Sequence, residues 1–396
     1  MYTLVLSVIY LAFISLGLPD SLLGSGWPVM QPELGVPVSF AGILTMLIAL
    51  GTVVSSLFSD ALTRRFGAGK VTAVSVLMTA VALLGFSVSS QFWMLILWAI
   101  PYGLGAGAVD AALNNYVALH YAARHMSWLH CFWGIGASVS PYIMSFALTG
   151  GYGWHTGYRI VGIAQLVLTA VLFCTLPLWK KVRLPQEKAE IQAARENPGA
   201  AKEKPGLLST LKTGGVIPML IAFCSYSAVE QTSMLWASSY LVQQRGMEAE
   251  TAAGFASLFF LGITIGRLLS GFVSERLGDK RLIRLGIVLT LIGVGLIALP
   301  WDGAVLAGLA VTGLGCAPVY PSIIHATPFN FGAEHSQAVI GVEMAGAYIG
   351  TTFLPPLFGW LASWTTISLL PVYLLFFTLL MLLMTERVNR IVAKRR

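Results

Sequence analysis

The chain alternates long apolar runs with short polar or charged segments. Most of the runs approach or exceed the roughly 20 residues that a helix needs to cross a bilayer. The pattern therefore predicts an all-α membrane protein with twelve transmembrane helices in two pseudo-symmetric six-helix bundles. The expected spans are 3–24, 38–58, 71–88, 92–119, 128–149, 157–179, 214–242, 252–273, 282–299, 303–325, 337–360 and 365–385.

Composition supports this class of protein. Of the 396 residues, 56% are hydrophobic and only 10% are charged, which is far more apolar sequence than a soluble fold can bury. The first span is not expected to be a cleaved signal peptide, because no basic residue precedes it. All four cysteines fall inside spans without ligand-like spacing, so packing is their expected role and neither a metal nor a cofactor is expected.

The apolar pattern is interrupted once by a long polar segment. We expect an N-terminal bundle over 1–180, a cytoplasmic linker over 181–212 and a C-terminal bundle over 213–396. The halves resemble each other, since several motifs recur at one separation. These are Gly103-Leu104-Gly105 with Gly313-Leu314-Gly315, His125 with His335, and Gly136-Ala137 with Gly346-Ala347; Ser59-Asp60 also recurs as Ser274-Glu275. Parallel repeats of this kind place a substrate site between the halves, near the bilayer midplane.

The basic residues predict the orientation. Of 24 lysines and arginines, only Arg159 and Arg245 lie in or next to the connections of one parity, between spans 5 and 6 and between spans 7 and 8. The positive-inside rule then places both termini in the cytoplasm, with the chain as a multi-pass protein of the plasma (inner) membrane. This bias also explains the net charge of +7, so no nucleic-acid partner is expected.

A strongly charged stretch stands between spans 252–273 and 282–299, and we expect it to be a short turn in water. It reads Gly266-Arg267-x-x-Ser270-Gly271-x-x-Ser274-Glu275-Arg276-x-Gly278-Asp279-Lys280-Arg281. The order of its glycines, acid, arginine and Lys-Arg pair resembles the loop fingerprint of the major facilitator superfamily. The resemblance implies the twelve-helix fold of that family and transport of small molecules as its activity.

The corresponding loop of the first half carries Asp60, Arg64 and Arg65. We expect Asp60 to lie against a helix end or a nearby arginine and to latch one conformation, because an unpaired acid there would be costly. The alternative is a plain cytoplasmic loop, which explains the arginines but not Asp60. The second-half members of the expected latch are Gly271, Glu275 and Arg276.

Four acids lie within spans: Asp20, Asp110, Glu230 and Glu343. An acid at mid-membrane costs a few kcal/mol on insertion scales, so each is expected to be paired, protonated or turned to a water-filled cavity. Asp20 follows Pro19, which lets a helix bend. For Glu343, a cavity position and a hydrogen bond to a neighbouring helix are the two alternatives.

Span 4 places Asp110 and Asn114 on one helix face, one turn apart. Span 5 follows with the motif His130-x-x-Trp133-Gly134-x-Gly136-Ala137. This combination resembles the fucose permease group and related hexose carriers. The resemblance implies that Asp110 couples protons to sugar uptake and that Asn114 lines the sugar site. The alternative is a structural hydrogen bond from Asp110 to Asn115 or His130.

Span 7 carries Tyr226, Glu230 and Trp236, with the first two on one face. Acids, amides and a flat aromatic ring suit the hydroxyls and the C–H face of a sugar. This pattern also resembles the hexose carriers. Trp133 is a second candidate platform, with packing as the equal alternative. The full set expected to bind substrate is Asn114, Asn115, His130, Trp133, Tyr226, Glu230, Gln231, Trp236, Tyr320 and Glu343, with Asp110 and Asp20 expected to couple protons.

No nucleotide-binding loop, catalytic triad or metal-ligand spacing occurs in the sequence, so an enzyme is not expected. The hypothesis is secondary, proton-coupled symport of a monosaccharide or similar small polar solute by alternating access. The alternatives are a proton-coupled exporter of drugs or amphiphiles, and sugar uptake coupled to Na⁺. The expected partners are that solute, a proton or Na⁺, and membrane lipid, and the chain is expected to be a monomer.

Overall fold

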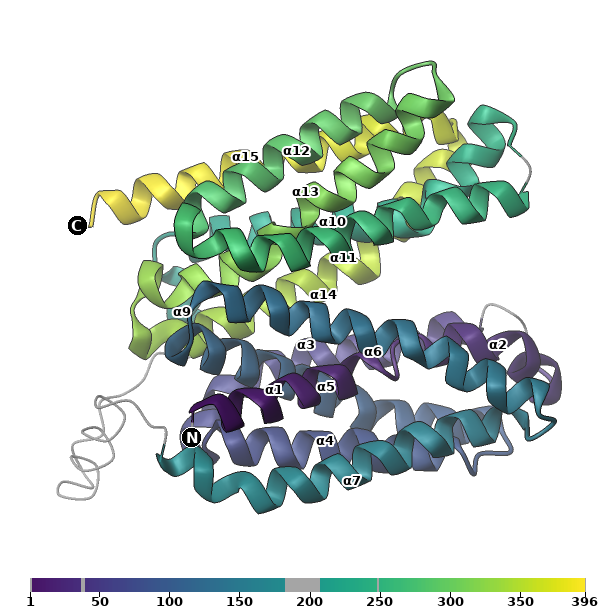
Figure 1. Cartoon of the computed structure of the whole chain (residues 1–396), viewed down its shortest axis with the longest axis vertical. Coiled ribbons are helices and arrows are strands. Elements are labelled where there is room, and N and C mark those ends of the chain that lie inside the picture. The colour runs from purple at the N-terminus through teal and green to yellow at the C-terminus, as the bar shows by residue number, and fades with distance from the viewer. Residues whose placement is uncertain (1, 37–39, 182–206, 248, 396) are drawn as a thin grey trace. The chain divides into compact units, whose positions relative to one another are not determined.

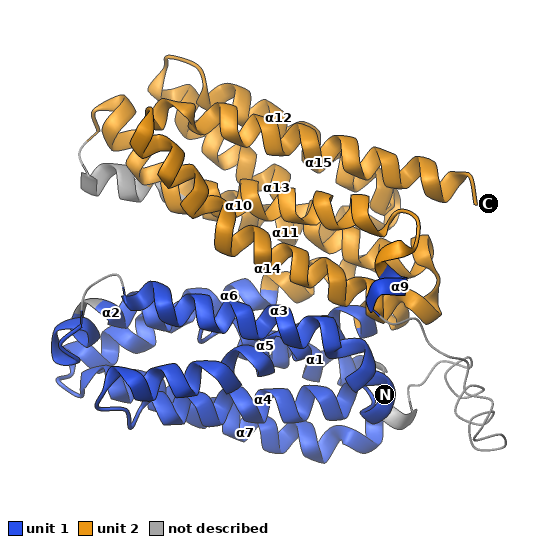
Figure 2. Cartoon of the chain, turned by 180° about the vertical axis from the view of Figure 1, so that it is seen from behind, with its two compact units in different colours: residues 1–116, 132–210 blue, residues 117–131, 211–396 orange. Residues whose placement is uncertain are grey.

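A computed structural model describes residues 2–36, 40–181, 207–247 and 249–395. The described chain is helical and divides into two compact units, coloured separately in Figure 2. The first comprises 1–116 and 132–210, and the second comprises 117–131 and 211–396. Most of the predicted linker over 181–212 lies outside the described residues, and its last six form a short helix, α9 (Leu207–Lys212).

The helices of the first unit follow the apolar runs closely. They are α1 (Tyr2–Gly17), α2 (Leu22–Glu33), α3 (Phe40–Phe66), α4 (Ala68–Phe86), α5 (Phe92–His120), α6 (Ala123–Thr149) and α7 (Gly153–Lys181), with the end of α5 and the start of α6 counted in the second unit. In Figure 1, α4 lies along α7. A buried cluster at one end, including Leu22, Trp27, Leu44, Leu83 and Trp154, joins the ends of α2, α3, α4 and α7.

The second unit repeats the same succession of long helices. They are α10 (Val216–Arg245), α11 (Ala249–Leu277), α12 (Asp279–Ile297), α13 (Asp302–Phe331), α14 (Ala333–Trp364), the 3-10 turn η1 (Ile367–Leu369) and α15 (Leu370–Ala393). Within this unit α13 packs along both α11 and α12, and α10 packs along both α14 and α15. The all-α architecture predicted from the apolar runs is confirmed.

The first predicted span is interrupted by a full break at the place where the sequence predicted that Pro19 lets the helix bend. Helix α1 ends at Gly17, a turn follows, and α2 begins at Leu22. Pro19 lies in this turn, where it has no amide hydrogen to donate to a helical hydrogen bond. The break leaves Asp20 on irregular backbone within the candidate span Thr3–Trp27.

The stretch 266–281 was expected to be a charged turn, and this prediction was wrong. Residues up to Leu277 belong to α11, and one glycine, Gly278, separates α11 from α12 with φ +73°. Gly67 makes the equivalent break between α3 and α4 with φ +82°. Both are left-handed positions that glycine adopts without steric strain. The expected repeat paired Asp60 with Glu275. When the units are aligned on these two glycines, Asp60 instead corresponds to Gly271.

Glycines bring helices into backbone contact at equivalent places in the two units. A Cβ added to Gly103 on α5 would lie 2.3 Å from the carbonyl oxygen of Ile48 on α3. A Cβ added to Gly313 on α13 would lie 2.1 Å from the carbonyl oxygen of Phe259 on α11. Only glycine permits such an approach. The repeat of Gly103-Leu104-Gly105 as Gly313-Leu314-Gly315 is therefore confirmed as a structural repeat.

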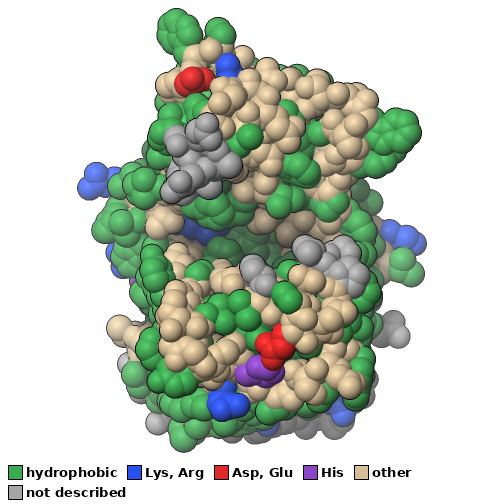
Figure 3. Space-filling model, turned by 90° about the vertical axis from the view of Figure 1, so that its right-hand side faces the viewer, with side chains coloured by type: hydrophobic (Ala, Val, Ile, Leu, Met, Phe, Trp, Pro, Cys, Tyr) green, Lys and Arg blue, Asp and Glu red, His purple; other side chains and the backbone are tan. Residues whose placement is uncertain are grey.

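Ten candidate spans among the described helices are long and apolar enough to cross a membrane. Neither α10 nor α12 is among them: the polar run Glu230 to Ser233 interrupts α10, and α12 begins with several charged residues. On the face drawn in Figure 3, hydrophobic side chains are widespread and charged side chains are few. Apolar side chains in this number on the outside suit contact with lipid.

Candidate functional site

Asp20 lies at the break between α1 and α2 and is held by two aromatic side chains. The hydroxyl of Tyr102 on α5 donates to Asp20 Oδ1 over 3.2 Å, and the indole N–H of Trp133 on α6 donates to Oδ2 over 2.9 Å. Asp20 as a whole residue is nevertheless exposed. An acid that is fixed by two donors and still open to water is able to exchange protons or bind an ion.

The close packing of α1 on α6 sets this geometry. A Cβ at Gly17 would lie 2.1 Å from the carbonyl oxygen of Trp133, and one at Gly136 would lie 2.1 Å from that of Ile14. The hydroxyl of Ser21 also donates to the carbonyl oxygen of Ala137 over 2.9 Å. The two helices therefore meet backbone to backbone one turn before Asp20, which brings the Trp133 indole within reach of the carboxylate.

Asp110 and Asn114 form the predicted pair on α5. The amide of Asn114 donates to Asp110 Oδ1 over 2.8 Å, and both side chains are buried. Asn115 is buried beside them. The structural alternative, a bond from Asp110 to Asn115 or His130, is neither confirmed nor contradicted by this contact. An amide one turn away satisfies one carboxyl oxygen of Asp110 and stabilises it away from bulk water.

In the second unit, Glu230 and Arg267 form a buried ion pair. Arg267 on α11 lies 3.1 Å from Glu230 Oε1 on α10, and the side chains retain only 7% and 10% exposure. The same oxygen accepts a 2.8 Å hydrogen bond from the hydroxyl of Tyr226, one turn earlier on α10. Two donors on one carboxylate oxygen are what an acid removed from water requires.

Aromatic rings pack beside Tyr226, the tyrosine that bonds to this pair. The Tyr320 ring lies 5.6 Å from that of Tyr226 and 4.7 Å from that of Phe223, measured between ring centroids. The rings of His130 and Tyr320, in the same unit, are nearly perpendicular, with 4.7 Å between their centroids. The cluster combines a carboxylate, a guanidinium and flat aromatic faces, which is the mixture suited to hydroxyl groups and the apolar face of a ring.

Two other predicted residues of α10 lie differently. The Trp236 indole donates to the carbonyl oxygen of Pro355 over 2.9 Å, and its ring fills the space left by Gly359 on α14. These are contacts of helix packing. Gln231 is half-buried next to Glu230.

Glu343 has a hydrogen-bond partner on a neighbouring helix, which is one of the two alternatives that the sequence left open for it. The hydroxyl of Thr327 on α13 lies 2.9 Å from one carboxyl oxygen of Glu343 and 3.0 Å from the other. Both side chains are buried. This contact joins α13 to α14.

The residues of the expected latch lie at the ends of α3 and α11. Asp60 is buried and pairs with Arg64 one turn later on α3, while Arg65 lies over the ring of Phe66 at 5.4 Å. Arg64 is therefore the nearby arginine that the sequence analysis suggested as a partner for Asp60. This pair joins two residues of one helix, so other contacts must carry any latch.

In the second unit, Glu275 lies 3.2 Å from Arg124, and both side chains are about half exposed. A Cβ at Gly271 would lie 2.2 Å from the indole nitrogen of Trp128. Arg276 is exposed on the last turn of α11. These contacts tie α11 to the segment 117–131, which the second unit includes.

The sequence did not identify Arg267, Tyr102 and Phe223 as site residues. Arg267 had a signal, because it falls inside the predicted span 252–273, where a basic residue is expensive unless paired. Because the stretch that contains Arg267 was expected to be a turn in water, no partner was predicted for its charge. Tyr102 and Phe223 are ordinary aromatic residues of apolar runs, and only their neighbours in space distinguish them.

Residues 9–258 and 248–395 match the Major Facilitator Superfamily. The chain belongs to this superfamily. It is a secondary transporter and a multi-pass integral membrane protein, as the resemblance of the charged stretch implied.

Its curated relatives are distant and carry different substrates. The chain is 22% identical to the glucose/mannose transporter GlcP of Bacillus subtilis (strain 168), with 91% of this chain and 88% of that protein covered. It is 23% identical to a hexuronate transporter of the same organism, with 77% and 72% covered. It is 24% identical to bypass of stop codon protein 6 of Saccharomyces cerevisiae (strain ATCC 204508 / S288c), where 67% of this chain spans 56% of that protein.

Solved structures share the fold. The chain superposes on FucP in its outward conformation with a TM-score of 0.77 at 14% identity, covering 97% of both chains. It superposes on the proton:xylose symporter XylE with a TM-score of 0.78 at 12% identity, covering 98% of this chain and 95% of that one. At such low identity the likeness establishes the twelve-helix fold alone.

Proposed function

We propose that this transporter moves a monosaccharide or a similar small polar solute together with protons, by alternating access. The observation that carries the proposal is the carboxylate of the exposed residue Asp20, held by Tyr102 and Trp133 at a break in the first span. Irregular backbone within a membrane span is tolerated where it lines a cavity or is covered by protein. An acid at such a place is suited to exchanging protons with water.

Asp110 is the second proton-coupling residue of the proposal. Its burial beside Asn114 disfavours a permanent charge, and protonation removes that cost. Asp110 and Asp20 would then take up and release the proton at different stages of the cycle. Na⁺ is the alternative coupling ion, since carboxylates at a helix break also suit it.

The substrate side of the proposal rests on polar groups of both units. Asn114 and Asn115 would supply amides, and the cluster of Glu230, Arg267 and Tyr226 would supply charged and hydroxyl groups. Tyr320, His130 and Trp133 would offer rings. The proposed set also includes Gln231, Trp236 and Glu343. Trp236 and Glu343 bond to neighbouring helices in this structure, and Gln231 is half-buried next to Glu230. Export of amphiphiles is the less favoured alternative, because it would suit a mainly apolar cavity.

An organic acid is a second candidate for the substrate. The buried Arg267 favours it, because a guanidinium binds carboxylates through paired hydrogen bonds. The hexuronate transporter among the relatives is named for a substrate that is both a sugar and an acid. In the proposal, such a substrate would compete with Glu230 for Arg267.

Uptake by the full chain in proteoliposomes tests the proposal. Hexoses, hexuronates, amino acids and cationic dyes would each be offered with and without an imposed pH gradient, in sodium-free buffer. We expect accumulation of a sugar, or of a sugar acid, only when the gradient is present. Accumulation of dyes alone, or accumulation that needs Na⁺, would replace this function by one of the alternatives.

Two variants then separate coupling from binding. Asp110→Asn keeps the shape and one hydrogen bond of the protonated acid but cannot cycle a proton. It should abolish accumulation against a gradient while sparing substrate binding and exchange between equal pools. Asp20→Asn is the matched comparison. If Asp110→Asn still concentrates the substrate when a pH gradient is imposed, the coupling role belongs to another residue.

A further inference from the structure

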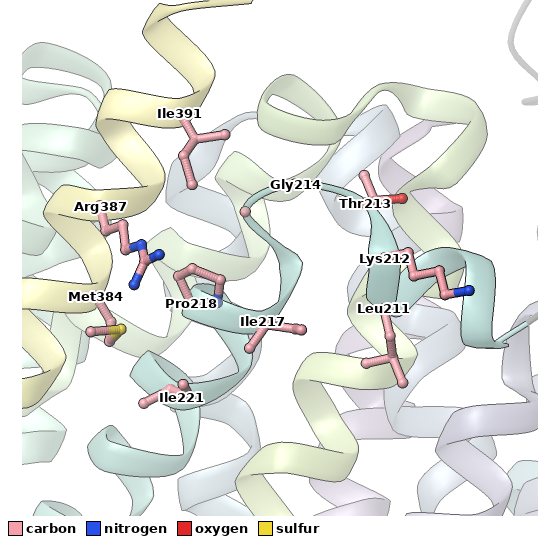
Figure 4. Close-up of a pocket in the computed structure, with 11 residues that line it drawn as sticks. Leu211, Lys212, Thr213, Gly214, Ile217, Pro218, Ile221, Met384, Arg387 and Ile391 are labelled. Atoms are coloured by element: carbon pink, nitrogen blue, oxygen red, sulfur yellow. The ribbon is translucent and has the colours of Figure 1, made fainter.

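A cavity of about 330 Å³ lies in the second unit, between the start of α10 and the last turns of α15 (Figure 4). One wall is formed by the end of α9, the segment that joins it to α10 and the first turns of α10, and the other by a single face of α15. The residues that line it are Leu211, Lys212, Thr213, Gly214, Gly215, Ile217, Pro218, Ile221, Met384, Arg387 and Ile391. None of them belongs to the candidate transport site.

The lining has two kinds of side chain. Ile217, Ile221, Met384 and Ile391 make it mainly apolar, whereas Arg387 brings a positive charge to its α15 wall. In Figure 4 Met384, Arg387 and Ile391 follow one another along α15, and Arg387 points toward the turn of α10 that carries Pro218. The cationic group therefore lies among apolar walls rather than apart from them.

The two cations of the lining are available to a ligand. Among the described residues, Lys212 and Arg387 make neither a hydrogen bond nor an ion pair through their side chains. The neighbouring acid Glu386 does not neutralise Arg387, because Arg284 on α12 holds both of its oxygens at 2.5 and 2.7 Å. Arg395 is also occupied, since it donates to the carbonyl oxygen of Gly214 over 2.8 Å at the rim.

The position of the cavity along the span narrows the choice of ligand. Arg387 lies in the last turns of the candidate span Ile367–Ala393, where a membrane helix passes from hydrocarbon to headgroups. Ile217, on the wall opposite, is 51% exposed. A soluble anion would bind the basic residues but would make no favourable contact with this apolar wall. A phospholipid with a negative headgroup satisfies both parts.

We propose that this cavity is a binding site for one anionic phospholipid. Arg387 and Lys212 bind its phosphate, and the start of an acyl chain lies against Ile217, Ile221 and Met384. The lipid would join the start of α10 to the end of α15, two helices of the same unit that already pack together. Lipid-facing basic residues attract anionic headgroups in this way at membrane surfaces.

Native mass spectrometry of the full chain in detergent tests the site. The protein would be titrated with dioleoyl phosphatidylglycerol and, separately, with dioleoyl phosphatidylcholine, which has the same chains but no net charge. We expect tighter binding of phosphatidylglycerol and a loss of about fivefold in its affinity for Arg387→Gln. Arg390→Gln is the matched control, because it removes the same charge one turn later on α15 but from outside the lining. Its affinity should stay within about twofold of the parent.

A second variant and a soluble probe keep the test decisive. Ile217→Trp fills the apolar wall at an exposed position and should weaken phosphatidylglycerol binding without removing a charge. Glycerol 3-phosphate carries the phosphate without the chains and should not displace the lipid. Equal losses for Arg387→Gln and Arg390→Gln would overturn the site in favour of diffuse surface charge. Displacement by glycerol 3-phosphate, or equal affinity for phosphatidylcholine, would overturn the lipid as its ligand.

Discussion

Arg267 and Glu230 face each other across 3.1 Å from adjacent helices, and both side chains are almost fully buried. Neither helix could insert this charge alone at low cost. Their pairing within one unit removes most of that cost, and Tyr226 completes the coordination of the shared oxygen. The pair therefore explains how two charges are tolerated in an apolar bundle, and it makes the stability of the unit depend on both residues at once.

We predict a strong coupling between these two residues. Arg267→Met or Glu230→Gln alone should lower the free energy of unfolding by about 3–5 kcal/mol, because each leaves the other group buried without its partner. The double variant should lose less than the sum of the two. SDS-induced unfolding in mixed micelles measures all four proteins.

The exposed pair of Arg284 and Glu386 provides the control, since Arg284→Gln removes an ion pair at which water can replace the lost contact. Its effect should be much smaller than that of either buried variant. Additive effects of Arg267→Met and Glu230→Gln would contradict the coupling.

The crossing of α1 and α6 gives a second prediction. Gly17→Ala would place a methyl group 2.1 Å from the carbonyl oxygen of Trp133, so the helices must separate. We expect a loss of about 1–3 kcal/mol in stability, as for other overpacked sites, and a weakened bond from Trp133 to Asp20. Gly24→Ala is the control, because nothing lies within 4 Å of its added carbon. Similar unfolding curves for both variants would contradict the close crossing.

The third prediction concerns the ends of α3 and α11. Asp60→Asn and Arg276→Ala should change the turnover of transport much more than the affinity for substrate, because they would shift a conformational equilibrium without touching the binding groups. Arg64→Gln removes only the intrahelical pair with Asp60, so it should change turnover less than Asp60→Asn does. Turnover and equilibrium binding would be measured on the same preparation. If binding is lost while turnover is normal, these residues are not a latch.

The fourth prediction concerns substrate affinity. Asn114→Ala and Tyr226→Phe each remove a buried hydrogen-bonding group, which should cost about 1–3 kcal/mol, or roughly tenfold to a hundredfold in affinity. Calorimetry or tryptophan quenching would report the dissociation constant. Thr378→Val is the control, because within the part of the chain that the structure describes this buried hydroxyl bonds only to the carbonyl oxygen of Leu374 in its own helix. Parent affinity in both site variants would move the substrate site elsewhere.

The sequence by itself determined which segments are helices and which acids fall within the apolar spans. Apolar runs near 20 residues long predict spans, since every backbone group must be satisfied inside the bilayer. The same reasoning singled out Asp20, Asp110, Glu230 and Glu343, because a charge in hydrocarbon needs an explanation. It also found the pair Asp110 and Asn114, which are one turn apart on a single helix. Local spacing was sufficient for each of these.

Only the tertiary structure decided the partners. Glu230 meets Arg267 on the next helix, and Asp20 meets Tyr102 and Trp133, which are 82 and 113 positions away along the chain. Hydrophobicity shows that a buried acid needs a partner, but the choice depends on how each helix is rotated and where it crosses its neighbour. Those crossings are set by contacts such as that of Gly17 with the Trp133 backbone, because side-chain volume fixes how closely two helices approach.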